Sequence, residues 1–248
     1  MTLDLIATST FGLEAVVARE LEALGYSARS PQTGRIEFSG DASAVARANL
    51  WLRSADRVLI RVGRFEARDF EALFEGIRAL PWDQWIAPGA RFPVSGRSVR
   101  SQLSSVPAIQ RCAKKAIVQK LLEAHSVQEL PETGATVPVE VALLKDVVTL
   151  TIDTSGDGLH KRGYRDLSGP APLRETLAAA LVQLTFWYPD RPLIDPFCGS
   201  GTICIEAAMI GRKMAPGLNR PFAAEFWPSF DRQAWDQARE EARATALA

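Results

Sequence analysis

Strand-like and helix-like hydrophobic periods alternate over the first 66 residues. The apolar run LDLIATS predicts a strand, and the next stretch, FGLEAVVARELEALG, spaces its apolar residues as on one face of a helix. GRIEFSG then predicts a second strand, DASAVARANLWLRSA a helix capped by Asp41, and DRVLIRVGRFEA a third strand. The order β-α-β-α-β within residues 1–66 predicts a compact α+β unit of the ferredoxin-like type.

A second unit is expected over residues 67–154. It should hold a helix broken at Pro81, a strand in ARFPVSG, a long helix in SSVPAIQRCAKKAIVQKLLEAH, and two strands that meet at Lys145 and Asp146 as a hairpin. Residues 155–172 are rich in Gly, Ser, Asp and Pro and predict a linker. Residues 173–248 then open with the helix LRETLAAALVQLTFWY and a short apolar strand, PLID.

Composition narrows the class of protein. Hydrophobic residues make up 47% of the 248 residues, and 29 basic side chains balance 29 acidic ones. The three cysteines form no C-x-x-C pair, so neither a disulfide framework nor a metal site is expected. The N-terminus lacks a cationic leader with a long apolar run, and no stretch approaches the ~20 apolar residues of a membrane span. We therefore expect a cytoplasmic protein with no membrane partner.

The charge is unevenly distributed despite this balance. Between residues 91 and 120 every charged residue is basic: Arg91, Arg97, Arg100, Arg111, Lys114, Lys115 and Lys120. This run predicts a face that contacts phosphates, with SGRSVRSQ as a flexible loop of donors; a solvated helix face is the alternative. HKRGYR adds Lys161, Arg162 and Arg165, which could contact RNA, close over a cofactor, or lie in a solvated linker.

The segment PLIDPFCGSGTICIEAAMIG combines an apolar run, an acid, a Gly-Ser-Gly turn and a helical stretch. It is no phosphate-binding P-loop because no lysine follows Gly201, and no dinucleotide fingerprint because Cys204 stands at the third glycine position. A carboxylate at Asp195 suits an ammonium group better than a phosphate. S-adenosylmethionine is thus the favoured ligand, while another nucleotide or a structural turn stays open. Cys198 is expected to pack as a small side chain, and Glu206 could face cofactor or solvent.

The full sequence of this segment resembles that of a known family, and so do three other segments of the chain. DPFCGSGTICIEAA is similar to motif I of the class I amino-methyltransferases, and GRSVRSQLSSVPAIQRCAKKAIVQKL resembles a THUMP domain. LHKRGYRDLSGPAPLRETLAAALV and APGLNRPFAAEFWPSFD resemble the flanking segments of bacterial THUMP-containing RNA methyltransferases. The chain thus resembles the N-terminal part of that family, nearest to the 23S rRNA guanine-N2 methyltransferases.

The resemblance implies an α+β chain with a ferredoxin-like unit, a THUMP domain, and the incomplete start of a Rossmann-like methyltransferase domain. It assigns cofactor binding to the turn and its flanks: Asp195, Pro196, Phe197, Cys198, Gly199, Ser200, Gly201 and Thr202. The partner it implies is RNA, with rRNA favoured and tRNA as an alternative.

The resemblance also implies a missing catalytic motif. Such enzymes align the target amine with a tetrapeptide that contains Pro-Pro, and the sequence has no Pro-Pro pair. We therefore expect the catalytic residues beyond Ala248, and a truncated chain that binds RNA without methylating it. A tRNA guanine-N2 enzyme, a DNA adenine-N6 enzyme and a non-catalytic RNA-binding module remain alternatives.

Overall fold

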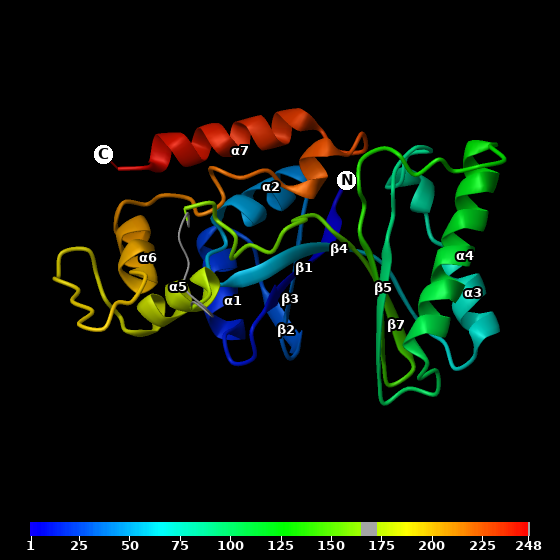
Figure 1. Ribbon diagram of the computed structural model, residues 1–248, viewed down its shortest axis with the longest axis horizontal. Coiled ribbons are helices and arrows are strands. Elements are labelled where there is room, and N and C mark those ends of the chain that lie inside the picture. The colour runs from blue at the N-terminus through cyan, green and yellow to red at the C-terminus, as the bar shows by residue number, and fades with distance from the viewer. Residues whose placement is uncertain (165–172, 248) are drawn as a thin grey trace. The chain divides into compact units, whose positions relative to one another are not determined.

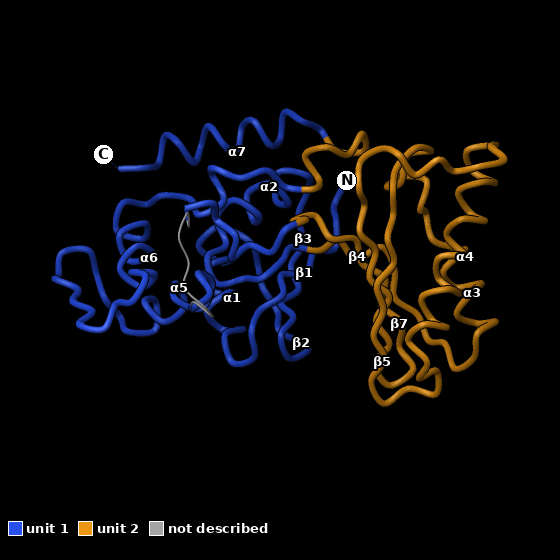
Figure 2. The backbone as a smooth tube through the Cα atoms, viewed as in Figure 1, with its two compact units in different colours: residues 1–58, 157–222, 231–248 blue, residues 59–156, 223–230 orange. Residues whose placement is uncertain are grey.

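The computed structural model describes residues 1–164 and 173–247, so Arg165, which the sequence suggests for RNA binding, lies outside the described residues. These residues group into two compact units (Figures 1 and 2). Unit 1 comprises residues 1–58, 157–222 and 231–248, and unit 2 comprises residues 59–156 and 223–230. The division differs from the expected sequence domains, because residues 223–230 join the same unit as residues 59–156.

Unit 1 begins with the expected ferredoxin-like pattern. Its strands pair in the order β2-β3-β1-β4, with β1 antiparallel to β3 and β3 antiparallel to β2. The first elements are β1 (Leu3–Ser9), α1 (Glu14–Ala23), β2 (Arg29–Gln32), β3 (Arg35–Gly40), α2 (Ala42–Trp51) and the start of β4 (Ala55–Glu66). The carboxylate of Asp41 accepts the amide of Ala44 at 3.0 Å, which confirms the predicted cap of α2.

The later part of unit 1 is helical. It contains α5 (Glu175–Leu184), α6 (Thr202–Gly211) and α7 (Arg232–Thr245). Helices α5 and α6 pack against each other, α5 also contacts α1, and α7 lies along α2 (Figure 1). A buried aromatic stack joins Phe222 to Trp235 of α7, with ring centroids 5.4 Å apart.

One expected strand does not form. Residues 192–195 have no regular secondary structure, and no strand occurs among the described residues after β7. A strand needs a neighbour that pairs with its backbone N–H and C=O groups, and here the adjacent elements are helices. Ile194, which a buried strand would cover, is therefore 84% exposed.

Unit 2 is a four-stranded sheet covered by two helices. The strand order is β4-β7-β6-β5; β4, β7 and β6 pair antiparallel, and β5 is parallel to β6. The elements are α3 (Phe70–Arg78), the 3-10 helix η1 (Trp82–Gln84), β5 (Val94–Val99), α4 (Val106–His125), β6 (Val139–Leu144), β7 (Val147–Asp153) and the 3-10 helix η2 (Ala223–Phe226). Helices α3 and α4 pack side by side (Figure 1).

The long helix expected in SSVPAIQRCAKKAIVQKLLEAH forms as α4 and supplies part of the core of unit 2. The buried residues of α4 are Ile109, Ala113, Ala116, Ile117 and Leu121. The β6–β7 hairpin turns at Lys145 and Asp146 as predicted, both with positive φ. The segment that follows Phe222 completes this core, because the indole nitrogen of Trp227 donates to the carbonyl of Thr136 at 2.8 Å.

The strand expected in ARFPVSG lies three residues further along. Residues 94–99 form β5 with alternating exposure, so much of SGRSVRSQ is an ordered strand and the expected flexible loop is wrong there. Exposure that alternates from residue to residue is typical of a strand with one face packed on the helices. The sequence does not show this alternation, because the glycine and the serine on the packed face are not strongly hydrophobic. No helix in the described part of the chain is long and apolar enough to cross a membrane.

Candidate functional site

The predicted cofactor turn leads into α6. Gly199 and Gly201 have φ values of 52° and 72°, in the left-handed region that favours glycine. The amide of Gly201 donates to the carbonyl of Cys198 at 2.8 Å and closes the turn. Thr202 begins the helix, so the N-terminus of α6 follows the two glycines directly. The sequence thus places a helix N-terminus at Gly199–Thr202.

Few atoms of the described residues lie where a side chain would stand at these glycines. Among residues 1–164 and 173–247, a Cβ added at Gly199 would meet nothing within 4 Å, and one at Gly201 would meet only the tip of Ile205, at 4.0 Å. A ligand can therefore approach the main chain at both positions. Asp195 folds back onto the turn, since its Oδ1 accepts the amide of Phe197 at 3.1 Å.

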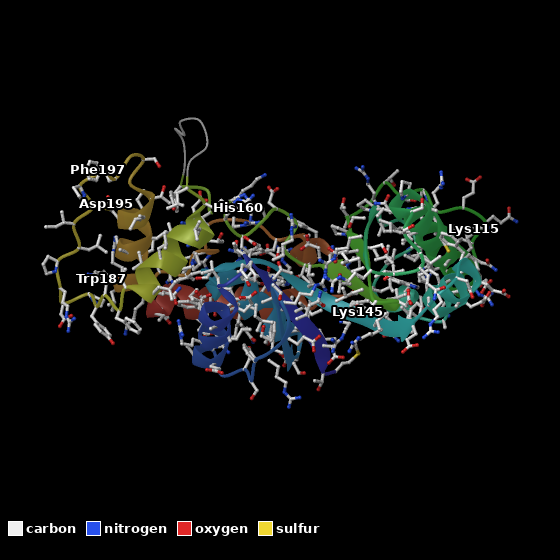
Figure 3. The ribbon with its side chains drawn as sticks, turned by 90° about the horizontal axis from the view of Figure 1, so that it is seen from below. Lys115, Lys145, His160, Trp187, Asp195 and Phe197 are labelled. Carbon is white, nitrogen blue, oxygen red and sulfur yellow. The ribbon has the colours of Figure 1, made fainter. Side chains whose placement is uncertain are left out.

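Two apolar side chains at the turn lie in solvent. Phe197 is 92% exposed (Figure 3), and Ile194 just before Asp195 is 84% exposed. Cys198 is exposed too, so its expected packing role is wrong in this structure. Exposed apolar residues at a glycine turn suit a surface that binds a ligand or another part of a protein.

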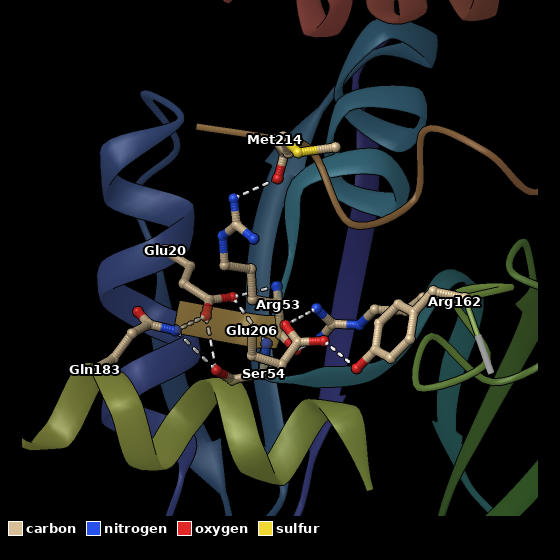
Figure 4. A network of polar contacts seen from close by, with 8 residues as sticks. Glu20, Arg53, Ser54, Arg162, Gln183, Glu206 and Met214 are labelled. Carbon is tan, nitrogen blue, oxygen red and sulfur yellow. Dashed lines mark hydrogen bonds and ion pairs between the residues drawn. The ribbon is translucent and has the colours of Figure 1, made fainter. Parts of the chain in front are cut away.

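Within its described residues, 160–164, the HKRGYR segment does not form a basic surface cluster. Lys161 pairs with Asp157 at 2.9 Å on the surface. Arg162 is only 3% exposed, and its guanidinium donates to the carboxylate of Glu206 and to the carbonyl of Arg53 (Figure 4). In this conformation Arg162 cannot reach a phosphate. The local sequence does not predict this burial. An arginine is buried where a carboxylate accepts from its guanidinium, and the carboxylate here belongs to Glu206, 44 residues later in the chain.

Glu206 does not face solvent. It is fully buried in α6, where Arg162 and the hydroxyl of Tyr164 both donate to it, the latter at 2.8 Å. Burial raises the pKa of Glu206, and the charge of Arg162 opposes that shift. Burial also raises the pKa of Tyr164, while burial and the nearby charge of Arg162 lower the pKa of Arg53 to about 10.

The remaining predicted RNA-binding residues lie in unit 2, where their environments differ. Two of them already have carboxylate partners. Arg97 lies 3.3 Å from Glu140, and Lys114 lies 2.6 Å from Glu132 while its ammonium sits over the ring of Phe92. The others are exposed and have no carboxylate partner among the described residues: Arg91, Arg100, Arg111 and Lys115.

Lys145, for which the sequence predicts only a turn role, lies beside Arg100. Its backbone amide donates to the carbonyl of Val99 at 3.1 Å, next to Arg100, and its side chain is exposed (Figure 3). The side chain of Asp146 fixes the same loop by accepting the amide of Gln102 at 2.7 Å. The sequence offers no signal for this neighbourhood, because the hairpin tip and the loop are more than 40 residues apart.

Comparisons with known proteins divide the chain into three parts. Residues 4–59 match the family described as the RlmL ferredoxin-like domain, residues 67–153 the THUMP domain, and residues 162–247 the RMKL-like methyltransferase domain. Within the described residues there is no group of three or more potential metal ligands.

Individual relatives are close over almost the whole chain. A protein of Bacillus subtilis strain 168, named putative RNA methyltransferase YpsC, is 54% identical over 239 residues, which is 96% of this chain and 62% of that protein. A crystal structure from Listeria monocytogenes, described as a predicted N6-adenine-specific DNA methylase, is 55% identical with a TM-score of 0.96. A putative methyltransferase complexed with SAH is 48% identical with a TM-score of 0.94. Each structure matches 99% of this chain, which spans 65% of theirs.

Proposed function

Since this chain belongs to the THUMP-domain-containing methyltransferases, we propose that it binds S-adenosylmethionine at residues 195–202 and RNA on unit 2. The proposed reaction is methylation of an exocyclic base nitrogen in RNA, with guanine N2 of 23S rRNA as the proposed target.

The open glycine turn carries this proposal. Gly199 and Gly201 leave the main chain accessible, and the first amides of α6 lie behind them. A phosphate ligand would favour a lysine in such a turn, and none follows Gly201. One oxygen of Asp195 accepts the Phe197 amide, which leaves the other to receive an ammonium group. The turn therefore suits the amino-acid end of S-adenosylmethionine, which supplies an activated methyl group when bound.

RNA is the proposed partner because unit 2, which contains the residues that match the THUMP domain, has exposed cations. Arg91, Arg100, Arg111 and Lys115 are free to contact phosphates, which position a nucleic acid without reading its sequence. The names of the relatives disagree, since one is called an RNA methyltransferase and another an N6-adenine-specific DNA methylase. Parallel binding assays with 23S rRNA fragments, tRNA and duplex DNA separate the possibilities; preference for DNA would overturn this part of the proposal.

We propose further that these 248 residues do not transfer methyl groups by themselves. The residues around Asp195 form no sheet edge, and the sequence has no Pro-Pro motif to align an amine with the methyl group. Incubation with tritiated S-adenosylmethionine and rRNA should leave the RNA unlabelled. Labelled RNA would contradict this proposal directly.

Equilibrium dialysis with tritiated S-adenosylmethionine tests the cofactor site. Asp195→Asn retains the acceptor for the Phe197 amide but loses the charge, so affinity should fall about tenfold or more. Asp190→Asn is the matched control, because Asp190 is an exposed carboxylate in the same loop before the turn. Equal binding by both variants would remove Asp195 from the site.

A further inference from the structure

A buried polar network surrounds the turn between α2 and β4, at Arg53 and Ser54 (Figure 4). All of its members belong to unit 1. It joins α1, this turn, the segment after Gly158, α5 and α6. None of its contacts is explained by the cofactor or RNA sites proposed above.

Helix α6 is held at its middle by Glu206. This carboxylate lies one helical turn after Thr202, ~6 Å along the axis. Arg162 binds it with one arm of the guanidinium and binds the carbonyl of Arg53 with the other, while Tyr164 donates to the second carboxylate oxygen. The position of the helix relative to the Arg53 turn is therefore set by one forked side chain.

Helix α6 is held again just after its end. The guanidinium of Arg53 donates to the carbonyl of Met214 at 2.5 Å, three residues after α6 ends. The backbone of Arg53 is itself fixed, because its amide donates to Glu20 of α1 at 2.8 Å. The middle of the helix and the segment just after its end are thus tied to one turn of the N-terminal domain.

The neighbouring helix α5 is tied to the same turn. Gln183 donates to Glu20 at 2.6 Å and to the hydroxyl of Ser54 at 3.0 Å, and that hydroxyl donates to Glu20 at 2.7 Å. Arg220 holds the backbone just before Arg162 by donating to the carbonyls of Asp157, Gly158 and Lys161. Tyr164 and Arg162 therefore start from a fixed backbone.

A buried ion pair of this kind adds little net stability, because removing both charges from water offsets their attraction. Its geometry nevertheless specifies one arrangement, since only a forked donor joins a carboxylate and a carbonyl at the same time. We infer that Arg162 and Tyr164 are positioning residues that hold Glu206, and with it the helix that carries the cofactor turn, against the Arg53–Ser54 turn. The inference rests on the proposed cofactor role of Gly199–Thr202.

Two conservative substitutions test it in the 248-residue chain. Tyr164→Phe removes one hydrogen bond to Glu206 without adding bulk, and Arg162→Lys keeps the charge but cannot form both contacts of the fork. Glu241→Gln is the matched control, because Glu241 pairs with Arg47 in unit 1 and fastens α7, not α6. Amide hydrogen exchange measured by mass spectrometry reports each helix separately.

The expected result is selective. In both test variants the amides of α6 should exchange about tenfold faster, while those of β1, α1 and β3 keep their protection. Affinity for S-adenosylhomocysteine should fall by a similar factor. The control should change neither quantity. Unchanged exchange in α6 would overturn the inference, and so would equal acceleration throughout unit 1, which indicates general stabilisation only.

The cofactor proposal fails separately. If the unmodified chain binds no S-adenosylhomocysteine, the cofactor role of the turn is wrong, while the exchange data still decide whether Arg162 and Tyr164 hold α6. If the unmodified chain binds it and both variants bind equally well with unchanged exchange, the positioning role is wrong and the cofactor proposal stands.

Discussion

Replacing Arg111 with alanine should reduce the salt dependence of RNA binding by the share of one phosphate contact. Arg111 is exposed on α4 and has no carboxylate partner among the described residues. Lys114, three residues later, already pairs with Glu132 at 2.6 Å. A cation that is neutralised within the protein releases few counterions from RNA, so Lys114→Met should leave the salt dependence almost unchanged although it alters the net charge equally.

The magnitude follows from the number of predicted RNA-binding residues that have no carboxylate partner among the described residues. Each phosphate contact contributes ~0.7–0.9 to the slope of log affinity against log salt. If Arg91, Arg100, Arg111 and Lys115 all contact phosphates, the slope should be about −3, and affinity should fall roughly a hundredfold between about 50 and 200 mM salt. Arg111→Ala should make the slope less steep by ~0.7–0.9.

Filter binding or fluorescence anisotropy with a structured rRNA fragment at four or more salt concentrations measures these slopes. Circular dichroism of each variant checks that unit 2 is folded. A flat slope in the unmodified chain would refute the phosphate-contacting face. Equal slopes for Arg111→Ala and Lys114→Met would refute the assignment of individual residues.

Three further outcomes are expected. Glu206→Leu should lower the free energy of unfolding by ~3–5 kcal/mol, because Arg162 stays buried without its partner. The double variant Arg162→Met/Glu206→Leu should lower the free energy of unfolding less than either single change; urea unfolding measures both. Burial lowers the pKa of His160 below 6.5, so the folded state binds a proton there less readily than the unfolded state, and the free energy of unfolding should decrease as pH falls through the window just below 6.5. NMR titration of His160 and the pH dependence of Tm in a His160→Gln variant check this, and a folded pKa above 6.5 would contradict it. Gly217→Ala should destabilise unit 1 by ~1–3 kcal/mol, since the added Cβ would lie 2.8 Å from the carbonyl oxygen of Asn49; an unchanged Tm would contradict this close contact.

Local signals predicted much of the fold. The helix α4, the cap at Asp41 and the turn at Lys145 are predictable from local sequence, and all three are confirmed. Strand β2 was not predicted because RSPQ shows no alternation and pairs irregularly with β3. The strand expected at residues 192–195 fails because a strand depends on a partner that its own residues do not encode.

The candidate site was predictable to a different degree. Glycine and acid spacing located the turn at residues 195–202, because positive φ and main-chain access are properties of single residues. The burial of Arg162 was not predictable, since it depends on Glu206 and on the carbonyl of Arg53, both distant in sequence. The same residue type at Arg111 remains exposed. Composition alone could not distinguish an anchoring arginine from an RNA-binding one.

Amide chemical-shift mapping of the ¹⁵N-labelled chain during titration with S-adenosylhomocysteine tests whether the turn at residues 195–202 binds the cofactor. We expect saturable shifts centred on Gly199, Gly201 and Thr202, which should be lost in Asp195→Asn and retained in Asp190→Asn. Shifts confined to another part of the chain, or none at saturating ligand, would contradict the assignment of this turn as the cofactor site.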